Sequence, residues 1–148
     1  MRQHIANTAT SIDGVNSSYA GQLGSGRIDA SAALSSDPQP KMYISDWTLD
    51  GQARVLPEPG SSYELVVTLE NTWLPTRNVV ATLSESDAYA SITDNNGDFG
   101  DLNTHQSGSN NANPFTIQLA SNAPYNHPIK FTLNLCGDGG YALSLPSR

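Results

Sequence analysis

Four side chains of this sequence have the types that nucleophilic catalysis most often uses: His4, His105, His127 and Cys136. A hydrolase triad joins a histidine to a serine or cysteine nucleophile and to a carboxylate. The G-x-S-x-G motif, which holds a serine nucleophile on a tight turn, does not occur. His105 and His127 fall in predicted loops, and Cys136 ends a predicted strand without an evident histidine partner. We therefore expect surface histidines, a passive thiol and no catalytic residue.

The segment TDNNGDFGD has the oxygen-rich composition of a calcium-binding loop. Asp94, Asn96 and Asp98 alternate, Asp101 follows, and hard cations prefer such oxygen ligands. The EF-hand pattern fails because His105 occupies the twelfth position, where that motif has a glutamate. Asparagine, glycine and aspartate are also typical of turns. We interpret the segment as a turn and expect no metal ion or cofactor, with calcium binding between Asp94 and Asp101 as the open alternative.

The two tryptophans, Trp47 and Trp73, are the aromatic candidates for a binding surface. Trp73 lies beside Leu74 in a predicted turn, and an exposed tryptophan can anchor a protein partner or stack on a sugar ring. We favour the alternative, in which Trp73 packs over the end of the fold. Trp47 is expected to be half-buried on the first strand.

Charge and composition exclude several classes of function. A net charge of -7 and a pI near 4.6 argue against binding to a phosphate backbone, which needs clustered basic residues. No segment approaches the ~18 apolar residues of a membrane span, and a single cysteine excludes an intramolecular disulfide. The basic residues are scattered along the chain: Arg2, Arg27, Lys41, Arg54, Arg77, Lys130 and Arg148.

Strict alternation of apolar and polar residues runs through most of the chain after residue 41. This period of two is the signature of strands with one face on a core and one in water. Residues 42–49 and 88–93 are weaker strand candidates. About seven strands separated by turn-rich segments predict an all-β fold, an antiparallel immunoglobulin-like β-sandwich, with a barrel as the alternative. The inward positions of the clearest strands are Tyr63, Leu65, Val67 and Leu69; Val79, Ala81 and Leu83; Phe115, Ile117 and Leu119; Phe131, Leu133 and Leu135; and Tyr141, Leu143 and Leu145.

The first 36 residues differ, being rich in alanine, serine and glycine and poor in large apolar side chains. The join SSDPQPK contains two prolines and no apolar residue, so we interpret it as a linker between a tail, residues 1–36, and a domain, residues 37–148. The tail is expected to be irregular or to form short helices, at RQHIANTA and at ASAAL, the second capped by Asp29. Such short helices are marginal without tertiary packing.

A spaced set of residues in the tail resembles the end of the subtilisin-like serine protease (subtilase) catalytic domain. Asn7-Thr8-Ala9 matches an N-T-A helix end, and Tyr19-Ala20 precedes the glycines of the closing motif G-x-G-[RLI]-[IV]-[DN]-A-x-x-A-[LV]. The residues that match the closing motif are Gly24, Gly26, Arg27, Ile28, Asp29, Ala30, Ala33 and Leu34.

The remainder resembles an accessory domain found after bacterial peptidase domains. The matching segments are Asp50-Gly51, Pro59-Gly60 and Leu69-Glu70-Asn71, then residues 78–87, residues 92–102 and Asn113-Pro114-Phe115. Ser61 departs from that pattern, since the family often has glutamate there.

The resemblance implies a non-catalytic C-terminal accessory domain of a secreted bacterial subtilase, one that stabilises, orients or anchors the protease or contacts its substrate. The catalytic Asp, His and Ser of that family would lie upstream, and no G-T-S motif occurs here. The implied partners are the parent protease domain, a protein substrate or a cell-surface glycan. The implied location is secreted or cell-surface, with any export signal upstream. The alternative function is an independent carbohydrate- or cell-surface-binding module.

Overall fold

The computed structural model describes residues 2–35, 38–53 and 55–146. The chain divides into two compact units, Met1–Gln39 and Pro40–Arg148. The tail boundary that the sequence predicts, at residues 36–37, lies outside the described residues. Within the described part, no helix is both long enough and apolar enough to cross a membrane.

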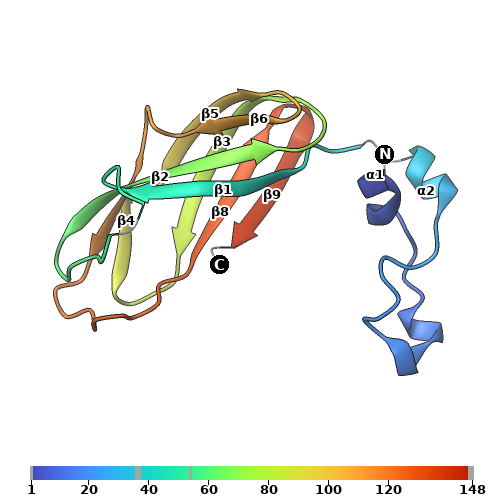
Figure 1. The fold of residues 1–148 in the computed structure, drawn as a ribbon, viewed down its shortest axis with the longest axis horizontal. Coiled ribbons are helices and arrows are strands. Elements are labelled where there is room, and N and C mark those ends of the chain that lie inside the picture. Colours follow the sequence, from blue (N-terminus) through green and yellow to red (C-terminus); the bar gives the residue numbers. More distant parts are fainter. Residues whose placement is uncertain (1, 36–37, 54, 147–148) are drawn as a thin grey trace. The chain divides into compact units, whose positions relative to one another are not determined.

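The second unit is a sandwich of two antiparallel sheets (Figure 1). One sheet has the order β1-β2-β7-β4, with β6 also paired to β2, and the other has the order β5-β3-β8-β9. This arrangement confirms the predicted all-β sandwich. The strands are β1 (Met42–Leu49), β2 (Ser62–Asn71), β3 (Thr76–Glu85), β4 (Ala90–Asp94), β5 (Asn96–Leu102), β6 (Gln106–Ser109), β7 (Phe115–Leu119), β8 (Phe131–Gly137) and β9 (Tyr141–Pro146), with a short 3-10 helix, η3 (Asp138–Gly140), between the last two.

The core lies between the sheets and is filled by the alternating residues that the sequence points to. Leu69, Phe115 and Leu135 are almost entirely buried, and each comes from a different strand. Some predicted inward residues, among them Tyr63 and Phe131, are only half-buried. These half-buried positions lie on one side of the sandwich, where the core is open to solvent.

The structure has nine strands where about seven are predicted. The two additional strands, β5 and β6, form where the sequence predicts turns. Gly97 and Phe99 alternate as buried positions of β5, and a Cβ on Gly97 would lie 2.7 Å from Cζ of Phe115. This part of β5 is held in place by a glycine that packs closely against a core aromatic ring, and not by a large apolar side chain of its own. Because the segment has the composition of a turn, the sequence does not predict the strand.

Two strands, β6 and β7, pair with different parts of the same edge of β2, and the buried Asn110 bonds to β2 between them. Residues 68–71 of β2 pair with β6, and residues 62–65 pair with β7. Between them, the side chain of Asn110 accepts the backbone N–H of Val67 at 2.7 Å and donates to the carbonyl of Leu65. An amide side chain thus satisfies the backbone groups that a continuous strand would otherwise pair.

The first unit, Met1–Gln39, contains two short α-helices, α1 (Arg2–Asn7) and α2 (Ala30–Ser35), and two 3-10 helices, η1 (Asp13–Val15) and η2 (Ser17–Tyr19). Asp29 caps α2, as predicted, by accepting the backbone N–H of Ala32 at 2.9 Å. Gly26 has a φ of 94°, and a Cβ there would lie 2.3 Å from the carbonyl oxygen of Thr10. Glycine is therefore required where Thr10 and Arg27 form a β-bridge.

Candidate functional site

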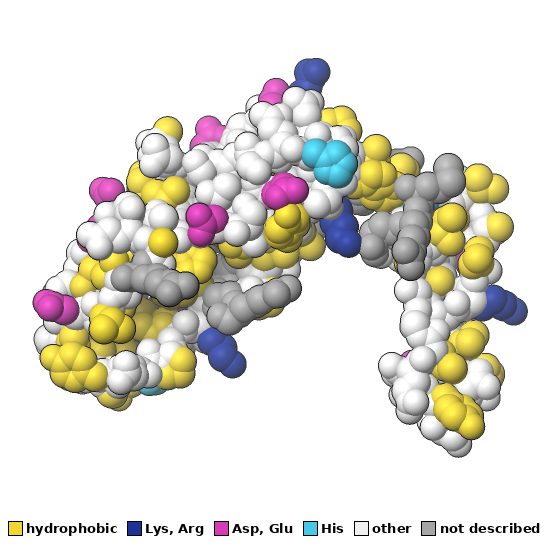
Figure 2. Space-filling model, viewed as in Figure 1, with side chains coloured by type: hydrophobic (Ala, Val, Ile, Leu, Met, Phe, Trp, Pro, Cys, Tyr) yellow, Lys and Arg dark blue, Asp and Glu magenta, His cyan; other side chains and the backbone are white. Residues whose placement is uncertain are grey.

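An apolar groove runs along the open side of the sandwich, between the edge strands β1 and β9. Its volume is about 1400 Å³. The floor is the core itself, where Val67, Leu83 and Leu133 from three strands are reached from outside. Figure 2 shows hydrophobic side chains gathered in a hollow on this side of the sandwich. The two sheets are thus spread apart on this side rather than closed by a further strand.

The walls of the groove carry most of the exposed large apolar side chains of the sandwich. Among the described residues of this unit, five such side chains are exposed: Tyr43, Trp47, Leu56, Val80 and Tyr125. All except Val80 line the groove. Leu56 and Tyr125 are 85% and 83% exposed, and they come from the β1–β2 and β7–β8 loops. A monomer seldom gathers its exposed apolar residues in one place unless something binds there.

The charged groups of the groove are acidic. Asp46 on β1 and Glu58 in the β1–β2 loop line it, and none of its described lining residues is lysine or arginine. Tyr63 contributes a polar contact, since its hydroxyl accepts the backbone N–H of Glu58 at 2.7 Å. An apolar floor lined by exposed carboxylates favours an apolar guest that carries positive charge.

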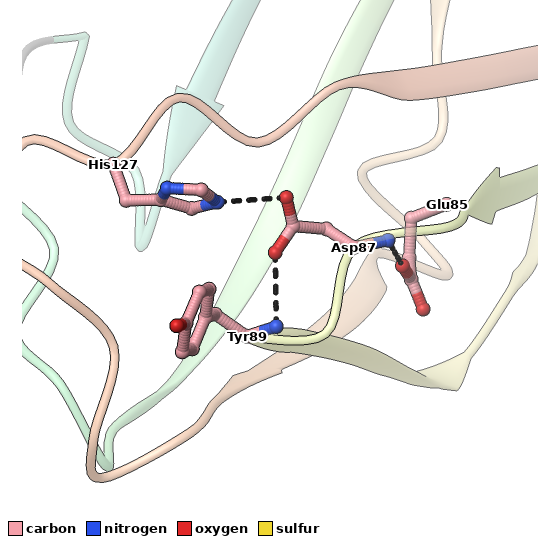
Figure 3. A network of polar contacts seen from close by, with 4 residues as sticks. All are labelled: Glu85, Asp87, Tyr89 and His127. Atoms are coloured by element: carbon pink, nitrogen blue, oxygen red, sulfur yellow. Dashed lines mark hydrogen bonds and ion pairs between the residues drawn. The ribbon is translucent and has the colours of Figure 1, made fainter.

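A polar network fixes one wall of the groove (Figure 3). Nε2 of His127 lies 2.8 Å from Oδ2 of Asp87, while Oδ1 of Asp87 accepts the backbone N–H of Tyr89 at 2.9 Å. The backbone N–H of Asp87 donates in turn to Glu85. The Tyr89 hydrogen bond, followed by the His127 contact, lowers the pKa of the Asp87 carboxyl below its usual value. The network ties the β7–β8 loop, which carries Tyr125, to the end of β3.

The histidines and the cysteine lie as follows. His127 pairs with Asp87, and its ring also packs edge-on against Tyr89 with centroids 4.9 Å apart. Nε2 of His4 lies 2.8 Å from the carbonyl oxygen of Ala33 in the first unit. His105 is exposed in the β5–β6 turn, and Cys136 is an exposed free thiol on β8. The hydrogen-bonding partners described for His127 and His4 are thus a carboxylate and a backbone carbonyl.

The acidic segment is the end of β4 and most of β5, which belong to different sheets, rather than a turn. Its carboxylates accept hydrogen bonds from different backbone N–H groups. Asp94 accepts the N–H of Asn96, and Asp98 accepts the N–H of Gly100. Asp101 accepts the N–H of Asn78 on the neighbouring strand at 3.0 Å. No cluster of three or more acidic, histidine or cysteine side chains suited to a metal ion occurs within residues 2–35, 38–53 and 55–146.

Of the two tryptophans, Trp73 has the packed environment favoured for it from the sequence, and Trp47 departs from its expected environment. Trp73 is half-buried, and its backbone N–H donates to Oδ1 of the buried Asn71 at 3.1 Å. Trp47, expected to be half-buried, is 46% exposed and lines the groove. The pattern of β1 breaks at Ser45 and Asp46, where the register with β2 shifts. This interruption of the apolar–polar alternation in β1 is the feature of the sequence that could have indicated the groove.

Comparison with known proteins shows no family for this chain. No family model matches the chain, and no curated protein matches it. Solved structures that resemble it include the archaellum periplasmic stator complex FlaF and FlaG from Sulfolobus acidocaldarius, with 16% identity, a TM-score of 0.35, and coverage of 76% of this chain and 93% of that one. FlaG from the same organism shows 13% identity over 73% of this chain and 99% of that one, with a TM-score of 0.36. Spo0M, a sporulation control protein from Bacillus subtilis, shows 17% identity over 76% of this chain and 49% of that one, with a TM-score of 0.41.

The resemblance to a subtilase is wrong. The structures that resemble the chain are stator and sporulation proteins, and no family model supports a protease. The parent protease, the accessory-domain role and the hydrolase assignment fall with it, and the carbohydrate-binding alternative gains no support. Local geometry explains the residues that suggested it, because Gly26 permits a close backbone approach and Asp29 caps a helix. Such turn and cap residues recur in unrelated proteins.

Proposed function

We propose that this protein is a non-catalytic interaction domain that binds a polypeptide segment of a partner protein in the groove between β1 and β9. The observation that carries the proposal is the gathering of Tyr43, Trp47, Leu56 and Tyr125 around one opening into the core. Exposed aromatic side chains beside a desolvated pocket are the usual anchors of protein interfaces.

A polypeptide suits the groove better than a compact ligand does. Small-molecule pockets enclose roughly 300–1,000 Å³, whereas this groove is larger, at about 1400 Å³, and is flanked by strands on both sides. Its longer flank, β1, has eight residues, which correspond to ~26 Å of extended chain. The carboxylates of Asp46 and Glu58 disfavour an anionic headgroup.

Support for a non-catalytic role comes from the groove lining. Its one histidine, His127, is engaged by Asp87 and packs on Tyr89, so its ring serves to hold the β7–β8 loop. The described lining contains no cysteine. An extracellular or cell-surface location belongs to the same proposal, since the surface relies on neutral polar side chains and charged residues make up only 14% of the chain.

The test is a calorimetric titration with a synthetic peptide in which valine alternates with threonine over about six residues, flanked by lysines. We expect saturable binding that weakens by at least about tenfold in the double variant Leu56→Asp, Tyr125→Ser, because both side chains are exposed and contribute to the groove rather than to the core. The matched control is Val80→Ser, exposed on β3 outside the groove. Absence of binding to the unaltered chain, or equal loss in the control, would overturn the proposal.

A further inference from the structure

Resting on that proposed function, we propose that the partner segment binds as an added β-strand along the free edge of β9 and not along β1. Both strands end their sheets, and both contribute to the groove lining, β1 along most of its length and β9 through Leu145 and Pro146. An edge strand offers unpaired N–H and C=O groups that a guest strand can complete. The two edges differ in how many of those groups remain available.

The edge of β1 is blocked at its centre. The register with β2 shifts between Ile44 and Asp46, which bends the strand and interrupts any ladder on its outer side. The carboxylate of Asp46 then accepts the backbone N–H of Trp47 at 2.8 Å. A guest strand would have to displace this charge-assisted bond to pair at Trp47.

The end of β1 is blocked as well. The N–H of Leu49 donates to the carbonyl of Gln52 at 3.0 Å, and the N–H of Gln52 donates back to Leu49 at 2.9 Å. The N–H of the next residue, Asp50, donates to Glu64 on β2. Since neighbouring residues of a strand direct their N–H and C=O groups to opposite sides, the N–H and C=O of Leu49 point away from β2, and the bridge to Gln52 occupies them. A bulge, an aspartate cap and a short return of the chain therefore protect β1 as natural edge strands are protected.

The edge of β9 has none of these devices. It pairs with β8 in an unbroken register, from Gly137↔Tyr141 to Thr132↔Pro146. Within the described residues, its backbone makes hydrogen bonds to β8 alone. Alternate residues of an antiparallel strand direct N–H and C=O away from their partner, so β9 leaves a regular set of groups unpaired. Its sequence, YALSLP, has no charged residue, and proline stands only at its last position.

Strand addition at β9 would also fill the groove. Tyr141, Leu143 and Leu145 point to the core side of β9, whereas Ala142 and Ser144 are exposed. A guest strand beside β9 has the same alternation, so every second side chain enters the groove and covers Leu83, Leu133 and Phe131. The partner segment is therefore extended, with apolar residues at alternate positions and lysine or arginine near Asp46 and Glu58.

The experiment compares two backbone-methylated forms of the lysine-flanked valine–threonine peptide, titrated into the full chain. In one form, the N-methyl groups stand on one alternate set of residues, and in the other they stand on the second set. N-methylation removes a donor and leaves the side chains in place, so the form methylated on the edge toward β9 should lose affinity on the order of tenfold or more, from the loss of about three hydrogen bonds. The other form should bind within about twofold of the parent peptide, because the facing β1 edge is already occupied.

Amide hydrogen exchange identifies the edge. The parent peptide should slow exchange at alternate amides of β9 and leave the amides of Ser45 and Trp47 unchanged. Equal affinity of the two methylated forms would overturn strand addition while leaving groove binding intact. New protection on β1 instead of β9 would overturn the choice of edge. Absence of binding by the parent peptide would sink the underlying function as well. If the chain dimerises at high concentration without peptide, and the same β9 amides become protected, then the strand that binds β9 comes from a second copy of the chain. That result would overturn the proposal of a partner protein.

Discussion

The two units of this protein differ most in what holds them together. The sandwich buries apolar side chains from both sheets in one continuous core. In the first unit, none of the residues with a described exposure is buried, and Val15, Ile28 and Leu34 are 84%, 69% and 89% exposed. The order of the first unit rests on local contacts, such as the Thr10–Arg27 bridge and the Asp29 cap.

This difference shows that helix caps and short-range hydrogen bonds do not stabilise a unit that lacks a buried apolar core. A helix cap is worth ~1 kcal/mol, and a six-residue helix is marginal even when it is well capped. Burial of a large apolar side chain contributes about 1.5–3 kcal/mol, and the sandwich repeats that contribution over many positions. The sandwich is therefore expected to fold by itself, and the first unit to be stable only against another surface.

The largest expected effect contrasts one core residue with one exposed residue. Phe115→Ala should destabilise the chain by about 3–5 kcal/mol, because Phe115 is fully buried and its loss leaves a cavity. Leu34→Ala should change the free energy of unfolding by less than about 0.5 kcal/mol. Urea denaturation followed by far-ultraviolet circular dichroism measures both, because Trp47 and Trp73 both lie in the sandwich and would report on that unit alone. Similar losses for the two variants would mean that the first unit has a core of its own.

A smaller effect is expected from the buried asparagine between β6 and β7. Asn110→Ala should cost about 1–3 kcal/mol, because the N–H of Val67 and the carbonyl of Leu65 would then be buried without a partner. Asn103→Ala is the matched control, since Asn103 is exposed and bonds only to Gln106. If both variants unfold at the same urea concentration as the parent chain, Asn110 does not bridge the split strand.

The smallest effect concerns Tyr141, the first residue of β9. Burial raises its pKa to about 12 in the folded state, against a usual value near 10. Between those values the unfolded chain loses the phenol proton and the folded chain keeps it. The contribution of the Tyr141 phenol to the free energy of unfolding is therefore fully present below pH 10. It falls by about 1.4 kcal/mol per pH unit as the pH rises from 10 toward 12. Denaturation at pH 9, 10 and 11 should show a shallower fall for Tyr141→Phe, whereas Tyr125→Phe, at an exposed site, should follow the parent chain.

The alternation of apolar residues was enough to predict the sandwich and most of its core. It located β1 at residues 42–49 and placed Leu65, Val67 and Leu69 correctly in the interior. It missed β5 and β6, because their packing depends on glycines such as Gly97 and Gly108, which contribute no hydrophobic signal. The groove was missed for a related reason. Alternation shows which face of a strand is apolar, but it does not show how far apart the two sheets lie. That spacing depends on contacts between residues far apart in the sequence, such as Asp87 and His127.

The same limit explains the wrong family assignment. Asn7-Thr8-Ala9 and the segment from Gly24 to Leu34 contain turn and capping residues, whose spacing follows from local backbone geometry. Local geometry is shared by many unrelated folds and does not identify a family.

The most direct measurement compares the full chain with residues 40–148 alone in a titration with the lysine-flanked peptide. Because the core and the groove both lie in the sandwich, the shortened chain should bind with the same affinity within about twofold and should unfold at the same urea concentration. A shortened chain that fails to fold or loses the peptide, or a full chain that does not bind it, would contradict the conclusion that the sandwich alone carries both stability and binding.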